Sequence, residues 1–201
     1  MIQHIFFDIG GVLGTNGWDH EQRARLVARF GLDAEDFEYR HQETVGAWEE
    51  GRMSTDEYLD ITIFDRVRPF TREEVRAFMR DQSRPDLAAI AVARAVAEHS
   101  DGPVMALNNE SEELNLHRIE SFGLRDIFAA FLSSCWLGYS KPSRRFYERA
   151  FAIAQADPRA SLFIDDREQN LAPARAMGVT TLRFESAPQL EMELRRLGAL
   201  P

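Results

Sequence analysis

The amino-acid sequence predicts an α/β protein: a Rossmann-like, doubly wound parallel sheet with an inserted all-helical cap. Three observations predict this class. Short apolar segments of strand length alternate with segments of helical periodicity through residues 85–201. Another apolar segment opens the chain and ends in Asp8 and glycines. Between these parts, residues 15–84 carry only helical patterns. We therefore expect residues 1–14 and 85–201 to form the sheet domain and residues 15–84 to form the cap.

The expected strands are short, apolar and bounded by glycine, proline or polar residues, as buried parallel strands tend to be. They are residues 3–8, 103–109, 128–134, 161–165 and 179–184. Parallel strands require crossover connections, which are usually helices. The segments between the strands supply them, with one apolar face each, at residues 85–99, 111–123, 142–154 and 167–178.

The insert shows helix signals of its own. One pattern covers residues 19–31 and another covers residues 33–51, and both end in glycine. Two further helices are expected after Ser54 and Thr71, because each is followed by glutamate at capping-box spacing. Ligands of open α/β sheets bind at the carboxyl ends of the strands. An insert that leaves the end of the first strand is therefore expected to lie over that site as a lid.

Composition excludes several classes of partner. The 201 residues carry a formal charge of −9, which argues against nucleic acid and against an anionic membrane surface. The apolar runs are far shorter than the ~20 residues that cross a bilayer.

The one cysteine, Cys135, allows no internal disulfide, and the N-terminus shows no export signal, so a cytoplasmic protein is expected. We expect a monomer or a homodimer.

Polar residues gather at the predicted strand ends. They are Asp8, Asn108, Asn109, Lys141, Asp165 and Asp166. Taken singly, each has an ordinary interpretation as a helix cap, a turn residue or a solvated lysine. Parallel strands, however, bring their carboxyl ends to one edge of the sheet, so we expect the six to meet in one crevice.

Four segments carry a resemblance to a known family. In chain order they are FFDIGGVLG, ALNN, the lysine of YSKPSRRFY, and FIDDREQN. Their order and spacing resemble the four motifs of the haloacid dehalogenase-like hydrolase superfamily, and the helical insert resembles the cap of its subfamily IA. Residues 106–178 are similar to the branch with sugar-phosphate phosphatases and the N-terminal domain of soluble epoxide hydrolases.

The resemblance implies an aspartyl-phosphate mechanism. Asp8 would be the nucleophile that attacks phosphorus. Lys141 would place a compact positive charge between Asp8 and the phosphate. Asn108 and Asn109 would bind the phosphate together with Lys141. The implied partner is a small phosphorylated metabolite, such as a sugar phosphate.

The resemblance also implies a Mg²⁺ cofactor. Its ligands would be the carboxylates of Asp8 and Asp166 and the backbone carbonyl of Gly10, which needs no side chain. Asp165 would act on the metal directly or through a water molecule. Carboxylates, carbonyls, water and a substrate phosphate are the usual environment of this ion.

The sequence departs from the family pattern at two positions. Family phosphatases have a second aspartate two residues after the nucleophile, which protonates the leaving oxygen and activates water. Gly10 can do neither, and such catalysis contributes roughly 10²–10⁴ in rate. Either the leaving group needs little acid, or water or a cap residue relays the proton, or the protein is weak or inactive and serves as a binding module. Asn108 replaces a serine or threonine, but its amide can donate the same hydrogen bond.

A 2-haloacid dehalogenase is the alternative enzyme. Those relatives also lack the second aspartate, because halide leaves without a proton, and they attack carbon without a metal. They lack a metal-binding acid pair in the fourth motif. The pair Asp165 and Asp166 therefore argues against this alternative.

The cap offers four aromatic or cationic residues that could contact substrate. We expect Trp48 to pack between helices and His41 and Arg52 to meet solvent. Trp18 is the best candidate for a substrate contact, because it lies where the chain leaves the first strand for the lid.

Overall fold

The structure, a computed structural model, describes residues 2–201, so Met1 of the predicted sheet domain lies outside it. Its parallel sheet has the order β2-β1-β3-β4. The strands are β1 (His4–Phe7), β2 (Val104–Ala106), β3 (Ser161–Asp165) and β4 (Thr180–Arg183). Phe7 pairs with Ala106 on one side and with Ile164 on the other. The ends of β2, β1 and β3 are therefore level at one edge of the sheet.

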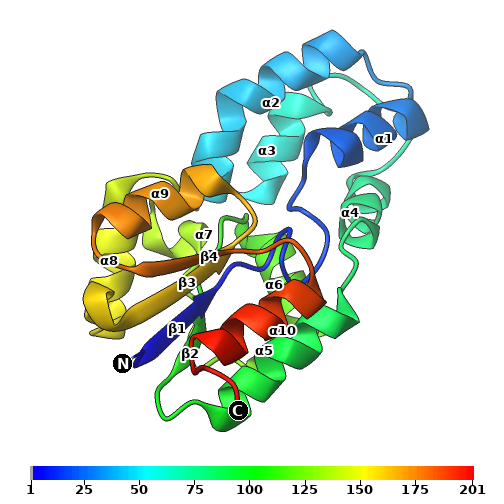
Figure 1. Ribbon diagram of the computed structural model, residues 1–201. Helices are drawn as coiled ribbons and strands as arrows, with labels where there is room; N and C mark the ends of the chain where they lie inside the picture. Colours follow the sequence, from blue (N-terminus) through cyan, green and yellow to red (C-terminus); the bar gives the residue numbers. More distant parts are fainter. Residues whose placement is uncertain (1) are drawn as a thin grey trace.

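Helices cover both faces of the sheet, which confirms the doubly wound class (Figure 1). Side chains alternate along β1: Ile5 and Phe7 pack on one face and Phe6 packs on the other. The first face is covered by α5 (Leu87–His99) and α10 (Ala187–Arg196). The second face is covered by α8 (Arg144–Ala154) and α9 (Glu168–Ala176).

The strand expected at residues 128–134 does not form as a regular strand. The chain runs beside β2, where the N–H groups of Ala129 and Leu132 each donate to a β2 carbonyl at 2.9 Å, but only Phe131 forms a bridge. The residues on either side of this segment belong to other elements. The chain reaches this edge from α6 (Glu112–Ser121) and η1 (Leu124–Asp126), and α7 (Ser134–Leu137) begins inside the expected strand. A short turn, η2 (Pro158–Ala160), leads into β3.

Four helices lie between β1 and α5 and are grouped at one end of the molecule (Figure 1). They are α1 (His20–Phe30), α2 (Ala34–Glu49), α3 (Thr55–Thr62) and α4 (Arg72–Asp81). Both predicted capping boxes are present, at Ser54 with Glu57 and at Thr71 with Glu74. Their apolar side chains form a cluster of their own that includes Trp48.

The two connections of this insert run side by side. The N–H of Thr15 donates to the carbonyl of Arg84 at 2.9 Å, and the N–H of Arg84 donates to the hydroxyl of Thr15 at 3.1 Å. This contact supports residues 15–84 as a cap with a paired hinge, and we propose those bounds. Among residues 2–201, no helix combines the length and the apolar character that a membrane crossing requires.

Candidate active site

Asp8 lies directly after β1, at the centre of the sheet. The residue is 6% exposed. The N–H of Ile9 donates to Oδ1 of Asp8 at 2.8 Å, which fixes one carboxylate oxygen. Oδ2 is left to meet Lys141. The Asp8 carboxylate is therefore buried and held in one orientation at the end of an apolar strand.

Lys141 is buried beside Asp8. Its ammonium nitrogen Nζ lies 2.9 Å from Oδ2 of Asp8 and 2.6 Å from Oδ2 of Asp165, and donates to the carbonyl of Leu107 at 3.0 Å. These three acceptors use all three N–H bonds of the ammonium. Burial alone opposes the charge, but Asp8 and Asp165 raise the pKa of Lys141, which keeps the side chain cationic.

Asp165, the last residue of β3, has both oxygens occupied. Oδ1 accepts from the N–H of Arg167 at 2.8 Å, while Oδ2 accepts from Lys141. The amide of Asn170 donates to both oxygens, at 3.0 and 3.1 Å. Asp165 thus holds Lys141 in place. Asn170 was not predicted from the sequence, although its place in the first turn of α9 aims it back at the end of β3.

The three aspartates form an acidic cluster. Asp8, Asp165 and Asp166 each have a carboxylate oxygen within 4.8 Å of the others. The cations beside these three carboxylates are Lys141 and, 3.9 Å from Oδ2 of Asp166, the half-exposed Arg167 guanidinium. Burial first, and then the neighbouring carboxylates, raise the pKa of Asp8 and of Asp166, so a bound cation would favour their ionised forms.

The cluster fits a divalent cation such as Mg²⁺. Oδ1 of Asp166 is buried without a hydrogen-bond partner among residues 2–201, so it is a free oxygen ligand. Oxygen ligands from one or two carboxylates are what Mg²⁺ takes from proteins. Asp8 and Asp166 are the natural pair, because Asp165 already accepts hydrogen bonds from Lys141, Arg167 and Asn170, whereas Asp8 accepts one from Ile9 and pairs with Lys141.

The missing side chain at Gly10 has a structural reason. A Cβ added at Gly10 would lie 3.1 Å from the backbone N of Gly17. The loop before α1 therefore occupies the space that a larger residue would need. Arg118 of α6 holds this loop, donating to the carbonyls of Thr15 at 2.6 Å and Asn16 at 2.8 Å. Arg118 itself is 1% exposed and was not predicted from the sequence.

The two asparagines after β2 differ in orientation. Asn108 is 1% exposed, and its amide is bonded to Asn115 at 2.9 Å and to Ser133 at 2.8 Å, away from the cluster. This side chain is therefore not placed for the phosphate contact that we expected. Asn109 does face the cluster. Its amide pairs with the backbone of Lys141 in two hydrogen bonds of 2.9 and 2.8 Å, so it positions the loop that carries the lysine.

A cavity of about 100 Å³ opens on Asp8 and Lys141, and neither Asp165 nor Asp166 is among the residues that line it. It has room for several waters or one small anion, since a water needs roughly 10–15 Å³ on this measure. The sequence-predicted residues Asp8, Gly10, Asn109 and Lys141 line it. The cavity also contains residues that sequence reasoning missed: Asn16, Gly17, Glu49, Arg167, Gln169 and Asn170.

The aromatic cap residues do not line this cavity. His41 was expected in solvent but is 3% exposed, because its Nδ1 pairs with the hydroxyl of Tyr58 at 2.8 Å in the cap interior. Trp18 is also buried and donates to the same hydroxyl at 3.0 Å. Trp48 stacks on Tyr58 at 4.1 Å, as packing between helices requires. Arg52 is exposed and pairs with Glu50, as its solvent-facing prediction implies.

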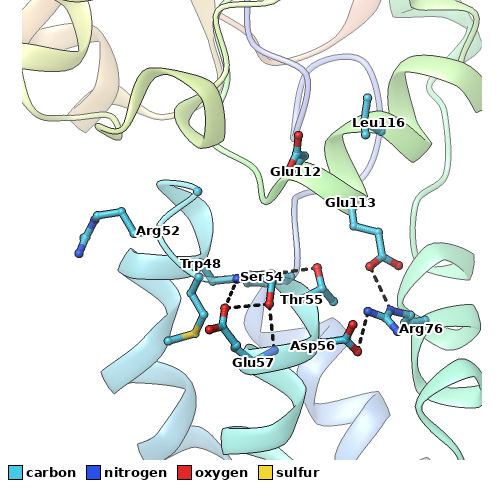
Figure 2. Close-up of a pocket in the computed structure, with 12 residues that line it drawn as sticks. Trp48, Arg52, Ser54, Thr55, Asp56, Glu57, Arg76, Glu112, Glu113 and Leu116 are labelled. Atoms are coloured by element: carbon cyan, nitrogen blue, oxygen red, sulfur yellow. Dashed lines mark hydrogen bonds and ion pairs between the residues drawn. The ribbon is translucent and has the colours of Figure 1, made fainter.

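A larger cavity of about 540 Å³ lies between α3, α4 and α6 (Figure 2). Figure 2 shows Arg76 reaching from α4 toward Asp56 and Glu113, at 3.0 Å from each carboxylate. Glu57 is engaged in its capping box with Ser54. The charged groups of this cavity are largely satisfied by one another, and none of the clustered aspartates lines it.

Comparisons with known proteins agree with this geometry. The family model described as haloacid dehalogenase-like hydrolase matches residues 2–178. Sesquiterpene phosphatase astK of Aspergillus oryzae is 31% identical over 72 residues, 36% of this chain and 37% of that protein. Bifunctional epoxide hydrolase 2 of Rattus norvegicus is 31% identical over 70 residues, 35% of this chain and 13% of that protein. The chain thus spans about a third or less of these curated relatives.

Solved structures share the fold at low identity. The enzyme bt-2542 of Bacteroides thetaiotaomicron, described as a complex with magnesium and inorganic phosphate, is 19% identical with a TM-score of 0.79. The match covers 92% of this chain and 95% of that one. L-2-haloacid dehalogenase of Xanthobacter autotrophicus is 20% identical with a TM-score of 0.62, over 97% and 83% of the two chains.

Proposed function

Because this chain belongs to the haloacid dehalogenase-like hydrolases, we propose that it is a Mg²⁺-dependent phosphomonoesterase of a small phosphorylated metabolite. Sugar phosphates are the first substrate class to test. One observation carries the proposal. The buried Asp8–Lys141 pair lies at a cluster of three carboxylates in which Oδ1 of Asp166 has no hydrogen-bond partner among residues 2–201, an arrangement that suits a divalent cation.

Asp8 is the nucleophile in this proposal. Its carboxylate attacks phosphorus, the bond to the leaving oxygen breaks, and an aspartyl-phosphate forms. Water then attacks phosphorus and releases inorganic phosphate and Asp8. Lys141 favours the ionised form of Asp8 and orients its carboxylate at 2.9 Å. Its positive charge also reduces the repulsion between Asp8 and the incoming dianion.

Asp8, Asp166 and the carbonyl of Gly10 would hold the Mg²⁺, with Asp165 beside them. The ion would supply positive charge against the phosphate oxygens and Asp8. Asp166 suits this role because its free oxygen Oδ1 has no competing donor among residues 2–201. Asn109 positions the Lys141 loop, and the cavity gives phosphate a place beside both.

The relatives support this choice without deciding it. One curated relative is named as a sesquiterpene phosphatase, and bt-2542 is described with magnesium and inorganic phosphate. The dehalogenase structures share the fold at 20% identity or less, as bt-2542 does, so likeness of fold alone does not choose between the two chemistries. Asp166 favours the phosphatase, because a metal-free attack on carbon has no use for a third, half-buried carboxylate beside Asp8 and Asp165.

A phosphatase assay tests the proposal. The purified protein is incubated with p-nitrophenyl phosphate and a panel of sugar phosphates, with Mg²⁺ or with excess chelator. We expect Mg²⁺-dependent release of phosphate that Asp8→Asn abolishes. Turnover that persists in Asp8→Asn would falsify the mechanism. Halide release from a 2-halopropionate without divalent metal would instead establish the dehalogenase.

A further inference from the structure

The fold leaves no side chain at Gly10 to protonate the leaving oxygen, yet a glutamate from the cap lines the same cavity. Glu49, the last residue of α2, lines the cavity together with Asp8 and Gly10. We propose that Glu49 is the general acid and base of this enzyme, supplied from the cap in place of the second aspartate of the sheet domain. This inference rests on the proposed phosphatase function.

The end of α2 is attached to the sheet domain. The hydroxyl of Ser134 in α7 donates to the backbone carbonyl of Glu49 at 2.7 Å. Gly51 has φ +68°, and a Cβ there would lie 2.0 Å from the carbonyl oxygen of Cys135. Such close backbone approach is possible only for glycine. The position of Glu49 over the cavity is therefore fixed by contacts across the boundary between cap and sheet domain.

The carboxylate of Glu49 is free to act. It is half-buried and makes no hydrogen bond or ion pair with any residue in the range 2–201. Burial and the Glu110 carboxylate, assisted by Glu50, raise the pKa of Glu49 to about 7, against the opposing charges of Arg167 and Arg23. An acid whose pKa lies near the working pH can give and take a proton with equal ease.

The proton balance is complete with this one residue. In the first step Asp8 attacks phosphorus, the bond between phosphorus and the leaving oxygen breaks, and protonated Glu49 gives its proton to that oxygen. In the second step ionised Glu49 takes a proton from water as the water oxygen attacks phosphorus. The bond between phosphorus and Asp8 then breaks. Glu49 ends protonated, and the net reaction consumes one phosphate ester and one water.

A burst experiment distinguishes this role from a structural one. Glu49→Gln cannot transfer a proton in either step. With p-nitrophenyl phosphate, whose leaving group needs little acid, we expect about one equivalent of nitrophenol in a rapid burst. Steady turnover should then be ~10²–10⁴-fold slower than in the native protein. With an alkyl phosphate such as glycerol phosphate, we expect the same loss without a burst.

Two further readouts and a control variant complete the test. Mass spectrometry of the acid-quenched Glu49→Gln protein should find phosphate on Asp8 during the nitrophenyl reaction. The native kcat should change with pH near 7, and this limb should vanish in the variant. Glu43→Gln, an exposed change on the same helix, should behave as the native protein in every assay. If Glu49→Gln folds poorly, Glu49→Ala with added formate replaces it, and formate should restore turnover.

The possible failures are distinct. If Glu49→Gln turns over the alkyl phosphate as fast as Glu43→Gln does, or loses both substrates equally with no burst and no trapped phosphate, the role of Glu49 is refuted. The phosphatase proposal survives either result, provided that the native protein is active and Asp8→Asn is not. If the native protein has no Mg²⁺-dependent activity, the phosphatase proposal itself fails.

Discussion

Lys141 and Asp8 form an ion pair that is almost removed from water: Nζ lies 2.9 Å from Oδ2, and the two side chains are 1% and 9% exposed. Asp165 is the second partner of the same ammonium, at 2.6 Å and 0% exposed. One lysine therefore compensates two buried carboxylates that the ends of two neighbouring strands bring together. The same side chain serves stability and, in the proposed mechanism, chemistry.

Removing the ammonium should therefore destabilise the fold as well as abolish activity. Lys141→Met leaves Asp8 and Asp165 buried without their cation, and removal of one partner from a buried pair typically costs ~3–5 kcal/mol. We expect a loss of this order in the free energy of unfolding, measured by urea denaturation with chelator present. The double variant Lys141→Met/Asp165→Asn should recover part of the stability and none of the turnover. A single variant as stable as the native protein would contradict this coupling.

Mg²⁺ should raise the melting temperature through Asp166. An ion that binds only the folded state stabilises it by ~2.7 kcal/mol at a hundred times its Kd. Asp166→Asn removes the carboxylate whose Oδ1 is buried without a partner. We expect this variant to need at least ~10-fold more Mg²⁺ for the same shift, since even indirect metal partners contribute this much. Asp126→Asn, an exposed change in η1, is the control and should titrate as the native protein does.

Restoring an aspartate at Gly10 should not improve the enzyme. The Cβ would lie 3.1 Å from the backbone N of Gly17, in a loop that Arg118 holds. Insertion of extra atoms into packed structure costs typically ~1–3 kcal/mol. Gly10→Asp should therefore melt earlier and turn over no faster than the native protein. The control is Gly46→Ala, whose Cβ meets nothing within 4 Å and should stabilise α2 by ~0.5–1 kcal/mol. If Gly10→Asp turned over faster than the native protein, the loop that contains Gly17 would have moved to accommodate the new side chain.

Much of this site could be predicted because parallel strands constrain where distant residues meet. Asp8 and Asp165 each end a short apolar segment, and the register of β1 with β3 makes those ends adjacent. The apolar runs themselves are strong signals, since both faces of the sheet are buried. The run at 128–134 has the same composition but only one neighbouring strand and a helix that begins within it, which local sequence does not reveal.

What the sequence could not supply is the direction of individual side chains. Asn108 and Asn109 are adjacent and identical, yet only Asn109 faces the cavity. Glu49 stands in a charged run, WEEGR, that reads as the solvated end of a helix. Its role depends on contacts with α7, which lies far along the chain. His41 is different, because a signal was present: with Phe37 and Trp48 it follows the helical spacing of a buried stripe on α2.

The buried state of His41 predicts how stability depends on pH. Burial first, and then the Arg23 guanidinium, lower the pKa of His41 to about 4, against the opposing Glu38 carboxylate and from an ordinary value near 6.5. Between these two values the unfolded chain binds a proton that the folded protein does not. The stabilisation from the neutral ring is therefore complete above pH ~6.5 and is lost as the pH falls toward ~4.

Urea denaturation of the native protein and of His41→Gln at pH 7 and pH 5 measures this effect. The free energy of unfolding of the native protein should fall as the pH is lowered from 7 to 5. The two pKa values of His41 account for roughly 2 kcal/mol of this fall. Glutamine offers the Tyr58 hydroxyl an amide, which can donate or accept, in place of the ring nitrogen, and that hydroxyl still accepts from Trp18 at 3.0 Å. His41→Gln should therefore lose less stability on acidification than the native protein. His20→Gln, which removes an exposed ring, is the comparison variant. Equal acid sensitivity in the native protein and His41→Gln would mean that the cap interior admits the charged ring.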